Sequence, residues 1–201
     1  IVLVGCYYGY TASGGPVGVG TATAKSMVLN TVMVHIVGMI GTQMASEIHP
    51  PKGPAIDLDY VRRFARAHED SGFDRILIGY FSNGPDGFLV ASYAAWATER
   101  LGLMLAHRPG FVVPTLAARK LATLDHFSGG RLAVHIISGG DDDDQRKDGD
   151  YLPHDERYAR TDEYVDILKR VWTSDRPIDH EGRYYKFKAA FSDVKPLQTP
   201  R

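Results

Sequence analysis

The chain has 201 residues, of which 44% are hydrophobic and 23% charged, and its formal net charge at pH 7 is -1. This is the composition of an ordinary globular domain with one sizeable core. The near-neutral charge and the scattered Lys and Arg residues argue against a nucleic-acid partner, and the lack of any run of ~20 apolar residues argues against a membrane partner.

Residues 1–26 differ in composition from the rest, because they are rich in Gly, Ala, Thr and Tyr and carry no charge before Lys25. The apolar run at residues 1–4 is too short for a signal peptide and has no basic residues ahead of it. We expect residues 1–26 to be an appended or disordered segment and residues 27–201 to form the domain. Two alternatives are open: Met27 is the natural start of the protein, or residues 1–26 form a genuine N-terminal arm.

The single cysteine, Cys6, excludes an intrachain disulfide and a zinc site built on cysteine pairs. This usage fits a reducing compartment, so a cytoplasmic location is expected. No metal site is expected either. The acidic run at residues 141–144 lacks the alternate spacing and the Gly turn of loops that bind hard cations, which favours a solvated, mobile loop or a lid.

From Met27 onward, short β-rich runs alternate with longer stretches of helical spacing. The first strand is predicted at residues 31–37 and is followed by a proline-containing loop. Asp57 is predicted to cap a helix that ends at Ser71-Gly72. One face of that helix is apolar and is expected to be covered: Leu58, Val61, Phe64, Ala65 and His68.

Three further strands are predicted at residues 75–78, 102–106 and 132–137. Helices follow the first two of these strands, at 87–98 and from 114 to a Ser-Gly-Gly stop at 128–130. A polar stretch then runs to residue 160. The next helix is expected to bury one face: Tyr164, Val165, Leu168, Val171 and Trp172. Residues 177–187 alternate around a Glu-Gly turn, which is typical of a β-hairpin.

Four successive β-then-α units indicate an α/β fold with parallel strands joined by right-handed crossovers. The candidates are a (β/α)8 barrel of the TIM type, or part of one, and an open doubly wound sheet. No Gly-x-Gly-x-x-Gly follows the first strand and no P-loop motif occurs, so dinucleotide and P-loop functions are disfavoured. Gly-x-Ser-x-Gly is also absent, so no nucleophile motif supports hydrolase chemistry.

Four landmarks occur in order between Met27 and the last residue. They are Ala-His-Arg-Pro-Gly at 106–110, the segment 115–131 with its Ala-Thr-Leu-Asp and Ser-Gly-Gly-Arg, Asp-Gly-Asp at 148–150 followed by Asp-Glu-Arg-Tyr at 155–158, and the hairpin 179–185 ahead of Pro-Leu-Gln at 196–198. In these landmarks the chain resembles the luciferase-like flavin monooxygenases, most closely the alkanesulfonate monooxygenase branch.

The resemblance implies a TIM barrel with insertions and a reduced flavin, FMNH2, over the carboxyl ends of the strands. A whole barrel needs about 250 residues, so this chain would supply about the first four β/α units plus an insertion hairpin. The implied reaction is an O2-dependent cleavage of a carbon–sulfur bond in an alkanesulfonate, giving an aldehyde and sulfite. The implied partners are a small-molecule substrate, O2, an NAD(P)H-dependent flavin reductase and further copies of the chain in a homo-oligomer.

Position by position, the resemblance assigns the FMN-binding role to Ser138 and Gly139 after the fourth strand and to Tyr158, with His154 added by proximity. A hydroxyl or a free backbone N–H there can bind the isoalloxazine edge or the ribityl chain. Gly84 stands where the alkanesulfonate branch carries a cysteine, which puts any role of that thiol in doubt.

His107 and Arg108, after the third predicted strand, are the catalytic candidates, because a cation there can face an anionic substrate or the flavin. The alternative is an ion pair that ties the loop to a helix. His35 and His135, inside strands, are interpreted as core or barrel-interior histidines.

Three hypotheses therefore stand. The first is an FMNH2-dependent monooxygenase of the alkanesulfonate type. The second is an oxidoreductase of the same superfamily that uses the deazaflavin F420 and transfers hydride without oxygen. The third is a truncated, inactive half barrel that survives by self-association of its exposed edge strands.

Overall fold

A computed structural model of the chain describes residues 12–13, 19, 21–26 and 54–198. By its contacts the chain divides into two units, 1–55 and 56–201, and the fold described below is that of the second unit. The strand predicted at 31–37 lies outside the described residues, as does most of the segment 1–26. No helix of the described part is long and apolar enough to span a membrane.

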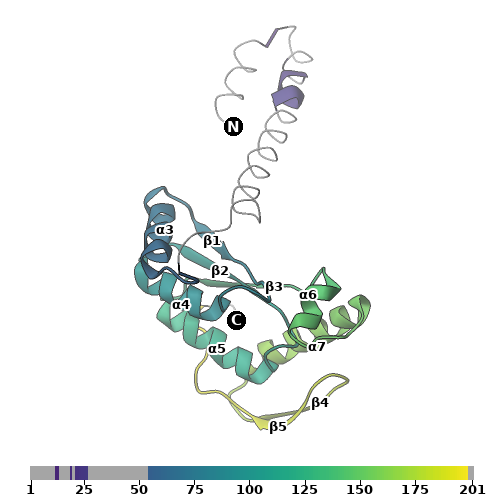
Figure 1. Ribbon diagram of the computed structural model, residues 1–201. Helices are drawn as coiled ribbons and strands as arrows, with labels where there is room; N and C mark the ends of the chain where they lie inside the picture. Colours follow the sequence, from purple (N-terminus) through teal and green to yellow (C-terminus); the bar gives the residue numbers. More distant parts are fainter. Residues whose placement is uncertain (1–11, 14–18, 20, 27–53, 199–201) are drawn as a thin grey trace. The chain divides into compact units, whose positions relative to one another are not determined.

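Three parallel strands form the central sheet of the second unit, in the spatial order β1-β2-β3 (Figure 1). They are β1 (Arg75–Ile78), β2 (Gly102–His107) and β3 (Leu132–Ile136). These bounds confirm the three predicted strands to within one residue. Sequential order of parallel neighbours is the arrangement that successive right-handed crossovers produce.

Helices α3 (Leu58–Asp70), α4 (Gly87–Ala97) and α5 (Pro114–Phe127) lie side by side on one face of this sheet (Figure 1). As predicted, Asp57 caps α3, because its carboxylate accepts the backbone N–H of Tyr60 at 2.8 Å. With α4 and α5 each covering the strands that they connect, the unit consists of consecutive β/α modules.

The hydrophobic core lies between the sheet and these helices. Leu103 and Leu105 of β2 are fully buried, and so are Ala117 and Ala118 of α5. The small side chains allow the helix backbone to approach the sheet closely, which gives the dense packing typical of protein interiors.

Two helices follow β3, namely α6 (Asp142–Lys147) and α7 (His154–Thr173). The expectation of a mobile loop at 141–144 is wrong. The Asp141 carboxylate caps α6 by accepting the N–H groups of Asp143 at 2.8 Å and Asp144 at 3.1 Å, and acidic residues stabilise the first turn of a helix. Helix α7 likewise begins at His154, inside the polar stretch that was expected to run to residue 160.

The predicted hairpin is present as antiparallel β4 (Ile178–Glu181) and β5 (Lys186–Ala190). Its turn is fixed to α7 by Glu163, whose carboxylate accepts the backbone N–H groups of residues 183–185 at 2.9–3.1 Å. His180 Nε2 also lies 2.9 Å from that carboxylate. Glu163 therefore holds the backbone of the turn, while Arg170 and Glu156 of α7 bind other groups of the hairpin.

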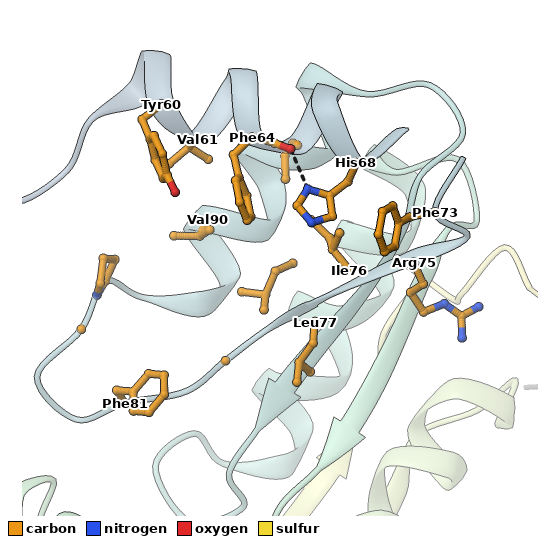
Figure 2. A pocket seen from close by; sticks show the side chains of 16 residues that line it. Tyr60, Val61, Phe64, His68, Phe73, Arg75, Ile76, Leu77, Phe81 and Val90 are labelled. Atoms are coloured by element: carbon orange, nitrogen blue, oxygen red, sulfur yellow. Dashed lines mark hydrogen bonds between the residues drawn. The ribbon is translucent and has the colours of Figure 1, made fainter. Parts of the chain in front are cut away.

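The apolar face of α3 is less covered than predicted. Ala65 is buried, but Leu58 is 57% exposed and Phe64 48% exposed within the described residues. Beside these side chains, α3, the outer edge of β1 and α4 enclose a groove of about 540 Å³, shown in Figure 2.

Candidate functional site

The three parallel strands end at the same edge of the sheet, and the loops that follow them meet α6 there. Ser82, in the loop after β1, donates its hydroxyl proton to the Asp144 carbonyl at 2.9 Å. Tyr80 of the same loop donates to the Asp148 carboxylate at 2.9 Å. Burial is the main reason that the pKa of Tyr80 is raised to about 12, followed by this hydrogen bond. In open α/β folds this edge is where ligands bind.

Arg108, the predicted cation after β2, is ion-paired in this cluster. Its side chain is 9% exposed, Nη2 lies 2.6 Å from Asp144 Oδ2, and its guanidinium sits 4.5 Å above the Tyr80 ring centroid. The hydrogen bond from Arg108 is the main reason that the pKa of Asp144 is lowered. The structure thus shows the ion pair between loop and helix that was the alternative for Arg108.

His107 points into the core rather than toward solvent. It is 2% exposed, and its Nε2 lies 2.6 Å from Tyr164 Oη, which donates its own proton to the Val112 carbonyl at 2.9 Å. His107 Nε2 must therefore carry the proton and donate to Tyr164. Burial, helped by the charge of Lys120, lowers the pKa of His107 to about 4, so the ring is neutral. This geometry favours a packing role, and the catalytic role of His107 stays a prediction.

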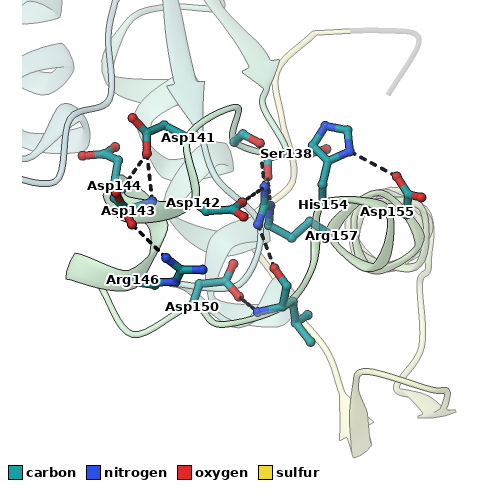
Figure 3. A network of polar contacts seen from close by, with 12 residues as sticks. Ser138, Asp141, Asp142, Asp143, Asp144, Arg146, Asp150, His154, Asp155 and Arg157 are labelled. Atoms are coloured by element: carbon teal, nitrogen blue, oxygen red, sulfur yellow. Dashed lines mark hydrogen bonds and ion pairs between the residues drawn. The ribbon is translucent and has the colours of Figure 1, made fainter.

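The four predicted cofactor residues lie around the first turns of α7. Arg157 of α7 donates to the carbonyls of Ser138 at 3.1 Å and Gly139 at 3.2 Å (Figure 3). The Ser138 hydroxyl lies 3.1 Å from Thr161 Oγ1, which itself donates to the Arg157 carbonyl at 2.7 Å. Ser138 therefore donates to Thr161 and keeps acceptor capacity on its oxygen.

His154 and Tyr158 occupy successive turns of α7, with ring centroids 5.0 Å apart. Tyr158 is 58% exposed, and its hydroxyl has no hydrogen-bond partner among the described residues. His154 Nδ1 lies 3.1 Å from Asp155 Oδ1, as Figure 3 shows. The start of α7 thus offers exposed polar side chains near the Ser138-Gly139 loop. His154 and Tyr158 were expected on a loop and lie on a helix instead, and their flavin-binding role stays a prediction.

The described residues fit part of an FMN molecule. Gly139 has φ +85°, and a Cβ there would lie 1.9 Å from Gln145 Nε2, so only glycine fits between the loop and α6. The neutral hydroxyls of Ser138 and Tyr158 are suited to ring-edge and ribityl oxygens and nitrogens. The adjacent cations Arg146 and Lys147 are already ion-paired with carboxylates of α6.

Two other kinds of site are not favoured. The groove in Figure 2 is lined almost entirely by apolar side chains, and its one imidazole, His68, already donates Nδ1–H to the Phe64 carbonyl at 2.8 Å. It lies at the outer edge of β1, not at the carboxyl ends of the strands. No cluster of His, Cys, Asp and Glu suited to a metal ion occurs in the described part of the chain.

Sequence reasoning missed the residue that assembles this site. Arg157 was recognised only as part of the Asp-Glu-Arg-Tyr landmark, although it is 1% exposed. Its burial could be anticipated only from the helical phase that it shares with Arg160, Tyr164 and Leu168, once the start of α7 is placed correctly.

Comparison with known proteins gives two family matches. The model of the luciferase-like monooxygenases matches residues 35–201, and that of the permease MlaE matches residues 1–44. An FMNH2-dependent dimethylsulfone monooxygenase from Pseudomonas putida is 40% identical over 152 residues, which cover 72% of this chain and 42% of that protein.

Two solved structures are similar over the same part of the chain. The monooxygenase RslO1 from Streptomyces bottropensis is 29% identical with a TM-score of 0.62, covering 71% of this chain and 45% of that one. DmoA from Hyphomicrobium sulfonivorans is 27% identical with a TM-score of 0.60, covering 70% and 39%. The chain therefore spans less than half the length of these relatives.

The likeness in fold extends further. An F420-dependent secondary alcohol dehydrogenase is 21% identical with a TM-score of 0.61, covering 72% of this chain and 47% of that one. At this identity the match shows a shared fold alone.

Proposed function

Because the chain belongs to the luciferase-like monooxygenase family and has the α/β fold of a partial TIM barrel, we propose that it forms part of an FMNH2-dependent monooxygenase. The observation that carries the proposal is the cluster of Ser138, Gly139, His154 and Tyr158 around the start of α7. Since the chain spans 42% of the length of the curated relative, its activity, substrate and partners are all part of the proposal.

The chain's own residues would bind and orient the flavin. Tyr158 would donate its free hydroxyl proton to a ribityl or phosphate oxygen, and Ser138 would accept a proton from the ring edge or the ribityl chain. Gly139 keeps the loop backbone free of a side chain at that place. When bound, reduced FMN supplies the electrons that activate O2, and the protein's contribution is to position it and exclude water.

For the substrate we propose a small organosulfur compound. The sequence resemblance indicated an alkanesulfonate, whereas the 40% identical relative is named for a sulfone. A sulfonate is an anion, and Arg108, the cation predicted to face an anionic substrate or the flavin, is paired with Asp144 at 2.6 Å. This pairing favours a neutral sulfone, and an alkanesulfonate would have to displace the Asp144 carboxylate from Arg108.

The partners follow from the proposed reaction. FMNH2 must be supplied, so we propose an NAD(P)H-dependent flavin reductase as a partner, consistent with the missing dinucleotide motif. A homo-oligomer and a cytoplasmic location remain parts of the same proposal.

Flavin titration of wild-type protein and two tyrosine variants tests the proposal. Wild-type protein should quench FMN fluorescence saturably, and Tyr158→Phe should weaken binding about three- to tenfold through loss of one hydrogen bond. The matched control is Tyr60→Phe, because Tyr60 is 54% exposed on α3, away from the site. The FMN affinity of Tyr60→Phe should equal that of wild type. No saturable binding of oxidised or reduced FMN by wild-type protein would overturn the proposal.

Oxygen uptake and F420 binding separate the remaining alternatives. With FMNH2 supplied, uptake of O2 that depends on dimethyl sulfone supports the sulfone, and uptake that depends on a short alkanesulfonate supports the alkanesulfonate. Binding of F420 in place of FMN, with hydride transfer and no oxygen uptake, would instead support the F420-dependent oxidoreductase.

A further inference from the structure

Two arginines of the second unit are surrounded by backbone carbonyls, one at each end of the sheet. Arg157 lies at the carboxyl end, on α7, and is 1% exposed. Arg131 directly precedes β3 and so lies at the amino end. In barrel folds, residues at the carboxyl ends of the strands serve function and residues at the amino ends serve stability. Comparing Arg157 with Arg131 therefore separates these two roles.

Arg157 joins three separate segments, as Figure 3 shows. Nε and Nη2 donate to the carbonyls of Ser138 at 3.1 Å and Gly139 at 3.2 Å, and Nη1 donates to the Leu152 carbonyl at 2.7 Å. Nη2 also lies 2.8 Å from Asp142 Oδ1. The loop after β3, the first turn of α6 and the residues just before α7 are thus held by one guanidinium.

Only arginine can make this set of contacts. A guanidinium carries five N–H donors in a fixed planar fork, whereas a lysine ammonium is a single point with three donors. The four acceptors approach Arg157 from three segments and occupy all three of its nitrogens. A lysine here would keep the positive charge and lose most of the contacts.

We infer that Arg157 is the positioning residue of the proposed flavin site: it fixes the Ser138-Gly139 loop relative to the start of α7, which carries His154 and Tyr158. The inference rests on the proposed function. Arg157 is buried and its donors point to protein oxygens, so it acts through the loop and not by touching the flavin. Without it the loop would lose the two carbonyl contacts to Arg157 and, among the described residues, keep only the hydrogen bond from the Ser138 hydroxyl to Thr161 as a side-chain link to α7.

Arg131 is the matched control. Its three nitrogens donate to the carbonyls of Ala95, Thr98, Leu101 and Ser128 and to the Thr98 hydroxyl, at 2.5–3.0 Å. It therefore donates to four backbone carbonyls, one more than Arg157, but to none at the carboxyl end of the strands. Removing it should destabilise the fold without loosening the loop after β3.

The first experiment needs no flavin. Hydrogen exchange of the full chain is compared for wild type, Arg157→Met and Arg131→Met. Arg157→Met should raise exchange by about tenfold or more within residues 138–152, while Arg131→Met should raise it around residues 95–101 and 128–131 instead. Equal protection of residues 138–152 in wild type and Arg157→Met would overturn the inference.

The second experiment measures FMN affinity and thermal stability on the same proteins. Arg157→Met and Arg157→Lys should both weaken FMN binding by about tenfold, and low millimolar guanidinium should restore affinity to Arg157→Ala. Arg131→Met should lower Tm at least as much and leave affinity within about threefold. If Arg131→Met weakens FMN binding as much as Arg157→Met, the effect is general destabilisation and the inference fails.

The two experiments separate failure of the inference from failure of the proposed function. If wild-type protein binds no FMN, the proposed function fails, and the exchange comparison still decides whether Arg157 orders the loop. If wild type binds FMN and Arg157→Lys binds equally well, the inference alone fails. If Arg157→Met does not fold, Arg157→Lys, which keeps the charge, takes its place in both measurements.

Discussion

Glu163→Gln tests the claim that the Glu163 carboxylate of α7 holds the backbone of the β4–β5 turn. Each carboxylate oxygen of Glu163 accepts two hydrogen bonds: Oε1 from His180 Nε2 and Tyr185 N, both at 2.9 Å, and Oε2 from Arg183 N at 3.1 Å and Tyr184 N at 3.0 Å. Glutamine has the same shape, but its NH2 group cannot accept, so two of the four bonds are lost whichever way the amide turns.

The expected loss of stability follows from that count. The side chain of Glu163 is 14% exposed, and a hydrogen bond to a charged group contributes about 1.5–3 kcal/mol when well buried. Two bonds to a turn that water partly reaches should contribute at the lower end, about 2–3 kcal/mol together. For a unit of this size that corresponds to a decrease in Tm of roughly 4–12 °C.

The effect should also depend on pH. Burial acts to raise the pKa of Glu163, but the hydrogen bonds from His180 and from the turn outweigh it and hold the pKa below its usual range. A carboxyl with a lowered folded-state pKa stabilises the fold above its unfolded pKa, and this contribution disappears as the pH falls through the folded value. The difference between wild type and Glu163→Gln should therefore be full at pH 7 and shrink below about pH 4.

Thermal unfolding of wild type and Glu163→Gln at pH 7 and at acidic pH is the assay. Glu181→Gln is the control, because Glu181 is on the same hairpin and its side chain is 76% exposed beside Lys186, where substitutions change stability by no more than about 0.5 kcal/mol. Equal stability of wild type and Glu163→Gln at pH 7, or a difference that does not decrease on acidification, would show that the Glu163 carboxylate does not stabilise the turn.

Two further substitutions test the geometry of the site and of the core. Gly139→Ala should lower the free energy of unfolding, measured by chemical denaturation, more than Gly129→Ala. Both glycines have positive φ, which costs about 1–2 kcal/mol for alanine, but only at Gly139 would the new Cβ overlap Gln145, at 1.9 Å. Equal losses of stability in the two variants would contradict this packing. Tyr164→Phe should lower the free energy of unfolding by about 1–3 kcal/mol in the same assay, because it leaves the buried Nε2–H of His107 without an acceptor. Unchanged stability of Tyr164→Phe would contradict the assigned hydrogen bond.

The regular elements of the second unit could be predicted because local signals and burial agree there. Strand β1 was predicted at its observed bounds, and Asp57 was predicted as the cap of α3. The starts of α6 and α7 were not predicted correctly, because several polar signals coincide in the stretch between β3 and residue 160. Asp141 caps α6, and Pro153 at the start of α7 follows twelve residues later, so a single polar stretch contains two helix starts.

The site could be predicted only in part. The resemblance pointed to Ser138, Gly139, His154 and Tyr158, and these do lie around the start of α7. It could not show that Arg108 is paired with Asp144, because that contact joins residues 36 positions apart. Nor could the sequence pattern reveal the role of Arg157. An arginine in a charged helical stretch is normally predicted to be exposed, and its burial follows only from the positions of the carbonyls that it contacts.

Hydrogen exchange of the chain with and without saturating FMN tests the proposed flavin site. We expect FMN to increase protection at residues 138–140 and 154–158, the two segments that carry the candidate site, and to leave protection in the groove between α3 and β1 unchanged. Protection confined to that groove, or no change at residues 138–140 and 154–158 under saturating FMN, would contradict the placement of the flavin at the carboxyl ends of the strands.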